Sequence, residues 1–579
     1  MYPQLQQTKI TSPAPEHEVL EAVAAWGCFG LTLGLIIAIW HRALNPAWIG
    51  GQTVLLLIVA GIALYHAART VPVALGSRAA WAVVLCSAPL LCIFMIHFGR
   101  LQFGGYDMSV VIDTGWRLHK GQRLYEDFLC TMPPAFCLGA KYSFLLFGVA
   151  WDSQLYVAAS FAVITYLWSY ALLSRLIPSR LGAVAAALMV QCLVHLSVCF
   201  WWYNAITSIT ATVFVLTCAL WTRAPESRFA QVSYIVSLAL LTTMKPNVAG
   251  VLIVGAGIVL FAAKQVSRGR LLLLTSAAFA MSVAAALAQG VSPIALVSSY
   301  AMARSRIRPH FELSLYGMPR GDQIIWVAAL FGLGLPLAVY LLRNLRRVKD
   351  MTAQDLSFHV LIYLGACVAF WAMLTNAELK LVDMPMLAVA AALLNSGETR
   401  ERDLGRRNSR WLTHLSRAAL CWVALQGLYL GIVRYRVEGI GYGSFYEPEL
   451  TAVAPGVPFF SSMHTGQRFP RVVAEIKTAL AHPGTGTVFF GPRMEWGYAA
   501  FNLPSPEHVP VWWHKGSSYA VADEAEVFKG WRQHRFDELI FLKDDLTDPG
   551  FYDFLPLVKS DYVRDDSFPN ISLFRRIVR

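Results

Sequence analysis

The feature that most constrains this chain is a series of apolar runs, each long enough to cross a lipid bilayer. A spanning helix needs about 20 predominantly apolar residues, and roughly thirteen runs meet this criterion. They lie at residues 20–40, 49–67, 79–98, 154–174, 181–201, 205–222, 229–244, 248–263, 270–289, 323–341, 356–374, 381–396 and 414–433. Only 15% of the residues are charged, whereas an average soluble protein has about 25%. The sequence therefore predicts a mainly α, polytopic membrane helix bundle.

The composition changes from membrane to water near residue 435. Of the 36 Asp and Glu residues, 18 lie after this point. Helical patterns at 470–481 and 523–533 alternate there with strand patterns at 487–490, 538–542 and 571–577. This alternation predicts a small C-terminal α/β domain, residues 435–579, with a single core. It contains no cysteine, so it is not a module built on disulfides.

The basic residues indicate how the bundle is oriented. A net charge of +12 could point to nucleic acid, but most Lys and Arg residues lie in short loops between spans, so we expect no nucleic-acid partner. The apolar run 135–150 is short and follows two prolines. If it lies on the membrane surface, the strongly basic loops all fall on one side, which the positive-inside rule assigns to the cytoplasm. The N-terminus is then cytoplasmic, and the C-terminal domain lies outside, as expected for a protein of a bacterial inner membrane.

This topology divides the chain into three parts. Residues 1–78 form two N-terminal spans, residues 79–434 form the main transmembrane domain, and residues 435–579 form the external domain. The transmembrane domain has two long external segments, 99–153 and 290–322, and both carry several Arg and Lys residues on the side that the rule disfavours. Positive charge there suggests binding of an anion at the outer membrane surface. Contact with lipid headgroups is the alternative.

Carboxylates are concentrated in the first external segment. Between residues 22 and 311 the chain has only six, and four of them are Asp107, Asp113, Glu126 and Asp127. Apolar residues in this stretch predict a short surface helix that starts after Asp107 and ends at Gly121. Asp107 stands where a helix N-cap belongs, Asp113 could pair with the residue four positions later on the exposed face of the helix, and Glu126 and Asp127 could form a solvated turn. The same carboxylates could also contact a substrate.

One carboxylate, external cations and a bundle of spans suit one particular reaction. When a sugar is carried on a polyprenyl phosphate, the bond between the anomeric carbon and the phosphate is broken, and phosphate leaves without being protonated. One general base is then enough, whereas glycosidases need two carboxylates. Cations would stabilise the departing phosphate, and the spans would hold the lipid.

A resemblance to a known family rests on the same loop. Asp107 is followed by Gly121, Tyr125 and Asp127, then by Pro133 and Pro134, and then by a short apolar helix that ends in Leu146, Phe147 and Gly148. This order resembles the first external loop of the GT-C superfamily of polyprenyl-phosphate-dependent glycosyltransferases, which includes protein O-mannosyltransferases and the lipid A aminoarabinose transferase. The resemblance covers roughly residues 80–250. The chain departs from the common pattern at Met108, where a second acidic residue is frequent, and in its two additional N-terminal spans.

The resemblance implies an inverting hexosyl- or pentosyltransferase that uses Asp107 as its catalytic base. The donor would be a polyprenyl-phosphate sugar, and the acceptor a glycan, lipid or protein. A divalent metal is left open, although Met108 weakens a metal-site interpretation. Two alternative hypotheses are kept. The chain could be another enzyme, a lipid-linked polysaccharide polymerase or ligase, or it could be a lipid or polysaccharide transporter.

Further substrate contacts are expected at external turns. Lys245 lies in a Lys-Pro turn between two spans that resembles a turn found in many GT-C enzymes, and we expect it to contact phosphate; snorkelling to headgroups is the alternative. Candidates for substrate binding are Asp113, Tyr125, Asp127, Lys245, Arg304, Arg306, Arg308, His310 and Glu378. Cys130 and Cys137 are the only two cysteines in a predicted loop, and the sequence does not decide between two thiols and a disulfide.

Overall fold

The structure is a computed structural model, and it describes residues 77–297, parts of 356–368, 452–543 and 558–577, apart from short gaps within these ranges. Seven bundle helices stand at the positions of seven predicted spans. They are α3 (Ser77–Gly99), α6 (Trp151–Leu176), α7 (Arg180–His195), α8 (Tyr203–Arg223), α9 (Arg228–Met244), α10 (Pro246–Ala262) and α11 (Arg268–Ala288). The predicted spans at 20–40, 49–67, 323–341, 381–396 and 414–433, and most of 356–374, lie outside the described residues.

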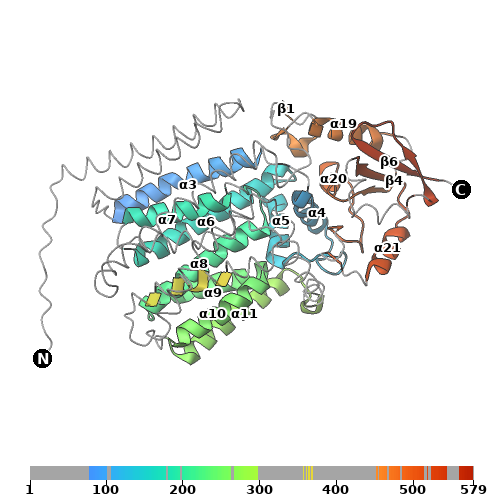
Figure 1. Ribbon diagram of the computed structural model, residues 1–579. Coiled ribbons are helices and arrows are strands. Elements are labelled where there is room, and N and C mark those ends of the chain that lie inside the picture. The colour runs from blue at the N-terminus through green and yellow to red at the C-terminus, as the bar shows by residue number, and fades with distance from the viewer. Residues whose placement is uncertain are drawn as a thin grey trace, which may run out of the picture.

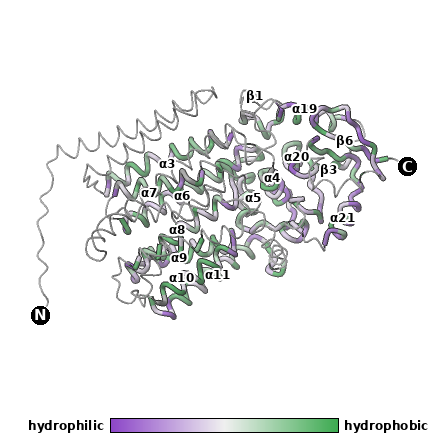
Figure 2. Tube along the Cα trace, viewed as in Figure 1, coloured by the Kyte–Doolittle hydropathy of each residue, from purple (hydrophilic) through white to green (hydrophobic). Residues whose placement is uncertain are grey.

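The bundle helices have the composition of membrane spans. Among the described residues, four helices are long and apolar enough to cross a membrane, namely α3, α6, α8 and α11. Large apolar side chains such as Leu85, Leu272 and Leu273 are exposed on the bundle, as expected where lipid rather than water surrounds a helix. Figure 2 shows hydrophobic residues along the bundle helices and more hydrophilic residues in the C-terminal part.

Helix α8 lies at the centre of the bundle, and all of its residues except the first and the last, Tyr203 and Arg223, are buried. Its polar residues are compatible with this position because their hydroxyl groups donate to backbone carbonyl groups one turn earlier: Thr210 to Ile206 O, and Thr217 to Val213 O, each at 2.8 Å. With 21 residues, the helix is about 32 Å long, close to the thickness of a bilayer core.

The basic residues of the short loops between α6 and α7, α8 and α9, and α10 and α11 lie at one end of the bundle, which we call the basic end. Arg223 donates to the carbonyl oxygens of Arg175 and Leu176, Arg180 donates to Ser174 O, and Arg270 forms an ion pair with Glu226 at 2.6 Å. We call the opposite end, where α8 begins and where helix α4 (Tyr106–His119) lies, the α4 end (Figure 1). Among the described residues, the structure thus brings together three of the basic loops that the sequence assigned to one side, those at 175–180, 223–228 and 268–270.

Two short helices lie at the α4 end, between the bundle and the C-terminal part (Figure 1). They are α4 (Tyr106–His119) and α5 (Pro134–Phe147). The end of α3 meets the start of α6 there, because Trp151 Nε1 donates to Gly99 O at 3.1 Å. Since α3 ends where α6 begins, α5 does not cross the bundle between them. The structure therefore puts the run 135–150 at one end of the bundle, as a surface helix requires, and its contact with a membrane surface stays a prediction.

The C-terminal part contains a four-stranded mixed sheet with the strand order β3-β4-β6-β5. Its strands are β3 (Val488–Phe490), β4 (Glu538–Leu542), β5 (Tyr562–Asp565) and β6 (Ile571–Arg576), and its helices are α19 (Arg468–Leu480), α20 (Trp496–Ala500) and α21 (Glu524–Gln533). Strands β3 and β4 are parallel, and the other pairs are antiparallel. Two short strands, β1 (Ala452–Val453) and β2 (His464–Thr465), pair separately. The predicted α/β character of this part is confirmed, and the structure adds α20, β1, β2 and β5 to the predicted elements.

The prediction of a single core in this domain was wrong. Successive strand residues point to opposite faces, and Phe489 and Leu539 belong to one buried cluster, together with Trp531 of α21. Phe490 and Ile540 belong to a second cluster that continues into the membrane bundle. One face of the sheet therefore packs within the domain, and the other contributes to a core shared with the rest of the protein.

Candidate functional site

Helix α4 holds the carboxylate that the sequence predicts to be the catalytic base. Asp107 is the second residue of this helix, which begins at Tyr106. The N-cap position predicted for Asp107 was therefore wrong by two residues, a displacement typical of helix ends. Val111, one turn after Asp107, is fully buried.

The pair Asp113–Arg117 forms as predicted, but it is buried rather than exposed. Arg117 Nε lies 2.7 Å from Asp113 Oδ2, and both side chains are almost completely inaccessible. Ser505 Oγ donates to Asp113 Oδ1 at 2.5 Å, and Arg117 also donates to Pro506 O. Burial raises the pKa of Asp113, while Arg117 and Ser505 oppose this rise. The sequence placed the pair on a solvated face because the residues that cover it lie almost 400 positions later.

The C-terminal domain is docked along α4 by further hydrogen bonds. Ser109 Oγ donates to Glu495 Oε2 at 2.6 Å and accepts from Trp496 N at 2.9 Å. Trp116 Nε1 donates to Leu503 O at 2.8 Å. The helix therefore has one side on the bundle and another under the C-terminal domain.

The segment after α4 also joins the two parts of the chain. Leu129 N donates to Val509 O at 3.2 Å, and Val511 N donates to Leu129 O at 3.0 Å. His508 N donates to Asp127 O at 2.6 Å. These backbone hydrogen bonds connect the two parts over a separation of about 380 residues, a distance at which no sequence pattern indicated a contact.

Asp127 and Glu126 form the solvated turn that the sequence offered as one interpretation. Arg123 Nη2 lies 2.9 Å from Asp127 Oδ1, and Arg123 Nη1 lies 2.6 Å from Glu126 Oε2. Hydrogen bonds from Arg123 lower the pKa of Asp127. Tyr125, which lies between Arg123 and Glu126 in the sequence, has a positive φ of 68°. Its hydroxyl group donates a hydrogen bond to Met132 O at 2.6 Å. The structure thus gives each of these predicted substrate contacts a partner within the loop.

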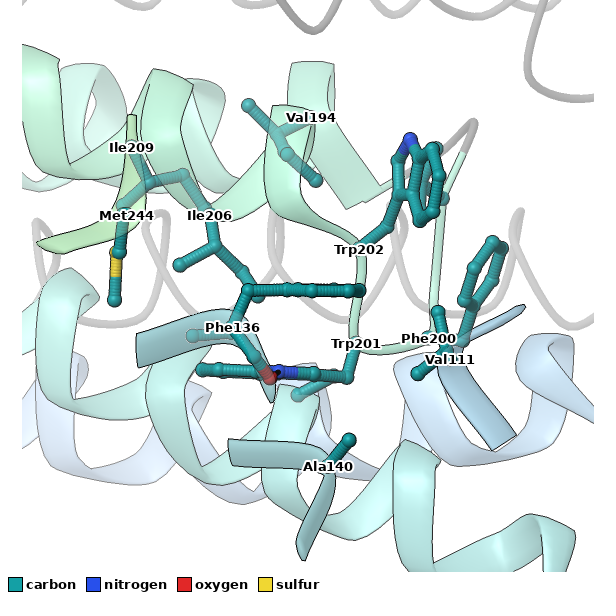
Figure 3. Close-up of a cluster of buried hydrophobic side chains, with 14 of the residues drawn as sticks. Val111, Phe136, Ala140, Val194, Phe200, Trp201, Trp202, Ile206, Ile209 and Met244 are labelled. Carbon is teal, nitrogen blue, oxygen red and sulfur yellow. Dashed lines mark hydrogen bonds between the residues drawn. The ribbon is translucent and has the colours of Figure 1, made fainter. Parts of the chain in front are cut away.

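Helix α5 is packed tightly between α4 and the bundle. A Cβ added to Gly115 of α4 would lie 2.8 Å from Ala140 O of α5, so only glycine allows this approach. Trp201 Nε1 donates to Phe136 O at 2.9 Å and crosses over Gly139. Figure 3 shows side chains from α4, α5, α8 and the segment before α8 in one buried cluster. The position of α4 is therefore fixed from the bundle side by close packing.

Lys245 lies at the α4 end, between α9 and α10. It is 9% exposed, its Nζ donates to Asn204 Oδ1 at 2.7 Å, and it lies 5.2 Å from the centre of the Tyr203 ring. A carbonyl oxygen and an aromatic face both attract an ammonium group. These contacts hold Lys245 at the start of α8, whereas a snorkelling lysine would extend to solvent. Asn204 had not been identified from the sequence.

Several cations of the first external segment are neutralised within the protein. Arg100 Nη2 lies 2.5 Å from Asp152 Oδ2, and Ser462 of the C-terminal part donates to the same carboxylate. Together with the ion pairs of Arg117 and Arg123, this accounts for three of the five basic residues of segment 99–153. The positive charges of these three arginines thus serve to hold the loop together.

The other predicted contacts, Arg304, Arg306, Arg308, His310 and Glu378, lie outside the described residues. Within the part of the chain that the structure describes, no group of three or more His, Cys, Asp or Glu residues could hold a metal ion.

Comparisons with known proteins give similarity in structure alone. No family model and no curated protein matches the sequence. A crystal structure of ArnT from Cupriavidus metallidurans bound to undecaprenyl phosphate is 11% identical, has a TM-score of 0.45, and is matched over 87% of this chain and 99% of that one. Arabinosyltransferase EmbB from Mycobacterium smegmatis is 12% identical with a TM-score of 0.37, over 70% of this chain and 46% of that one.

A third similar structure is the oligosaccharyltransferase AglB from Archaeoglobus fulgidus, in complex with an inhibitory peptide and a dolichol-phosphate. It is 14% identical with a TM-score of 0.34, over 85% of this chain and 74% of that one. Each of these three structures is matched over 70% or more of this chain, at 14% sequence identity or less.

Proposed function

We propose that this chain is an integral membrane glycosyltransferase. It transfers a sugar from a polyprenyl-phosphate donor to a hydroxyl group of the acceptor at the external face of the membrane, with inversion at the anomeric carbon. The observation that carries the proposal is the composition of the α4 end: the Asp107 turn of α4 and the buried Lys245 lie at the same end of an apolar bundle. The positive-inside rule makes this end external, because the basic residues of the short loops between the bundle helices lie at the other one.

Asp107 is the general base in this proposal. Its carboxylate accepts the proton of the acceptor hydroxyl while the hydroxyl oxygen attacks the anomeric carbon. The bond between that carbon and the phosphate oxygen breaks, and the polyprenyl phosphate leaves with the bonding electrons. Attack from the face opposite the phosphate inverts the configuration.

Lys245 is the cation that contacts the donor phosphate. If the α4 end is external, as proposed, the start of α8 lies where a lipid phosphate meets the hydrocarbon region, and Lys245 supplies an ammonium group there. Asn204 and Tyr203 hold this group in position, so less conformational entropy is lost when phosphate binds. Asp113, whose two oxygens accept from Ser505 and Arg117, is assigned to docking of the C-terminal domain rather than to the substrate.

The proposal is tested first with Asp107→Asn. Activity is measured in membranes with undecaprenyl-phosphate sugars as donors, and folding is checked by size-exclusion chromatography in detergent. Asparagine has a similar size but cannot accept the proton, so we expect kcat to fall by about 10²–10⁴-fold with a much smaller change in KM. Asp566→Asn is the matched control, because it makes the same chemical change on the exposed surface of the C-terminal domain. Full activity of Asp107→Asn would remove the single-base mechanism.

Lys245→Met separates donor binding from proton transfer. We expect weaker binding of undecaprenyl phosphate to this variant, because a charge-assisted contact is lost. Asp107→Asn should bind the same lipid about as well as the wild type. Equal affinity of Lys245→Met and wild type would exclude Lys245 from the phosphate site.

A further inference from the structure

Cys130 and Cys137 are close together at the α4 end. Their Sγ atoms lie 3.7 Å apart, and both side chains are buried. Residues 127–129 bind the C-terminal domain through their backbone, and we call them the interdomain segment. Cys130 directly follows this segment, and Cys137 lies in α5.

A disulfide at this place requires only a small movement. The Sγ–Sγ distance would shorten by about 1.7 Å to the usual bond length. Cys130 follows Leu129, which pairs with the C-terminal domain, and Cys137 is in the first turn of α5. A bond between them would tie the interdomain segment to the helix that packs against α4.

The chemistry of the two thiols favours a structural pair. Burial raises the pKa of the Cys137 thiol well above its usual value, and Cys130 raises it further. Reactive cysteines have a lowered pKa and access to solvent, so Cys137 is not a nucleophile or a sensor of that kind. A bond formed before the loop closes would afterwards be protected from reductants by the same burial.

We infer that Cys130 and Cys137 form a structural disulfide in the mature protein. The inference rests on the external orientation in the proposed function, because disulfides form and persist in oxidising compartments. The two thiols lose two protons and two electrons as the Sγ–Sγ bond forms. The electrons and protons pass to an oxidant of that compartment that carries a reactive disulfide. This disulfide is reduced to two thiols.

The test is a differential labelling of thiols in the full-length chain. Membranes are denatured and free thiols are blocked with N-ethylmaleimide, after which the protein is reduced and labelled with a heavier isotopic form. Cyanogen bromide cleaves after Met132, between the two cysteines, so each peptide is identified by mass. We expect the heavy label on Cys130 and Cys137 and the light label on Cys199 and Cys218. Light label on both members of the pair would overturn the inference.

A variant identifies the bonding partner. In Cys130→Ser, we expect Cys137 to become a free thiol and to change from heavy to light label. Cys218→Ser, a buried cysteine of α8, is the matched control and should leave the labels of the pair unchanged. If Cys137 keeps the heavy label in Cys130→Ser, it is bonded to another cysteine, and the proposed pairing is wrong.

Sugar transfer by the same membranes separates this inference from the proposed function. Heavy label on the pair without transfer from any polyprenyl-phosphate donor would support the disulfide and count against the enzyme. Transfer by a protein with both thiols free would overturn the disulfide and leave the enzyme standing. As a second readout, a reductant should lower the midpoint of thermal unfolding of the wild type, because it reaches the bond once heating opens the loop. It should not lower the midpoint of the double variant Cys130→Ser/Cys137→Ser. An equal response of the two would contradict the disulfide.

Discussion

Removal of Arg117 should release α4 from the C-terminal domain. In Arg117→Met, the buried carboxyl group of Asp113 loses its cation, and Pro506 O loses a donor. Breaking a buried ion pair by removing one partner costs about 3–5 kcal/mol. Because about 1.4 kcal/mol corresponds to a tenfold change in an equilibrium constant, the opened form of α4 should become about 10²–10⁴-fold more populated.

Hydrogen–deuterium exchange of the α4 amides measures this population, since these amides exchange through local opening. Arg123→Met is the control: it breaks an ion pair of a largely exposed arginine, so we expect exchange in α4 to change by less than about tenfold.

A double-mutant cycle tests the reasoning more strictly. Asp113→Leu leaves a buried Arg117 without its anion and should cost about as much as Arg117→Met. The double variant leaves no buried charge, so its α4 should open no more readily than that of either single variant. Additive effects would amount to about 6–10 kcal/mol. Additivity, or exchange in Arg117→Met as slow as in the wild type, would refute the interpretation of this pair as the anchor of the C-terminal domain.

Three further predictions concern the same end of the molecule. Gly115→Ala should destabilise the packing of α4 on α5 by about 1–3 kcal/mol, seen as a lower midpoint of thermal unfolding, whereas Gly250→Ala, with open space around it, should cause no loss. Burial and nearby lysines lower the pKa of His119. The contribution of its neutral ring to stability is therefore present above about pH 6.5 and declines as the pH falls below that value. His119→Phe should remove this component from the pH dependence of the unfolding midpoint. Arg100→Met leaves the carboxylate of Asp152 without its ion-pair partner, and limited proteolysis should then cleave the link between α3 and α4 faster; equal rates would show that the pair is not needed there.

Local patterns predicted most of the helices and strands correctly. Strand β4 was predicted with its exact bounds, and α19 within two residues, because Val472 and Ile476 recur at the spacing of one helical face. The buried Asp113–Arg117 pair shows the limit of this reasoning. Spacing along one helix predicts that two side chains can meet, but it carries no information about what covers them.

The candidate site divides in the same way. Asp107 and Lys245 could be proposed from their residue types and their places next to predicted spans. Asn204 and Ser505 could not, since a neutral side chain in a span or a distant loop gives no signal until folding places it beside a charge.

The sequence by itself determined that this is a helical membrane protein with a C-terminal α/β part, and which helix ends share a side. These properties follow from the length of apolar runs and from the distribution of charge, which act locally along the chain. Only the tertiary structure decided that the C-terminal part is docked on α4 and shares a core with the bundle. It also decided that Cys130 lies next to Cys137. Such contacts depend on how the surfaces of separate elements fit together, and the loop geometry that brings them together is not encoded in any short pattern.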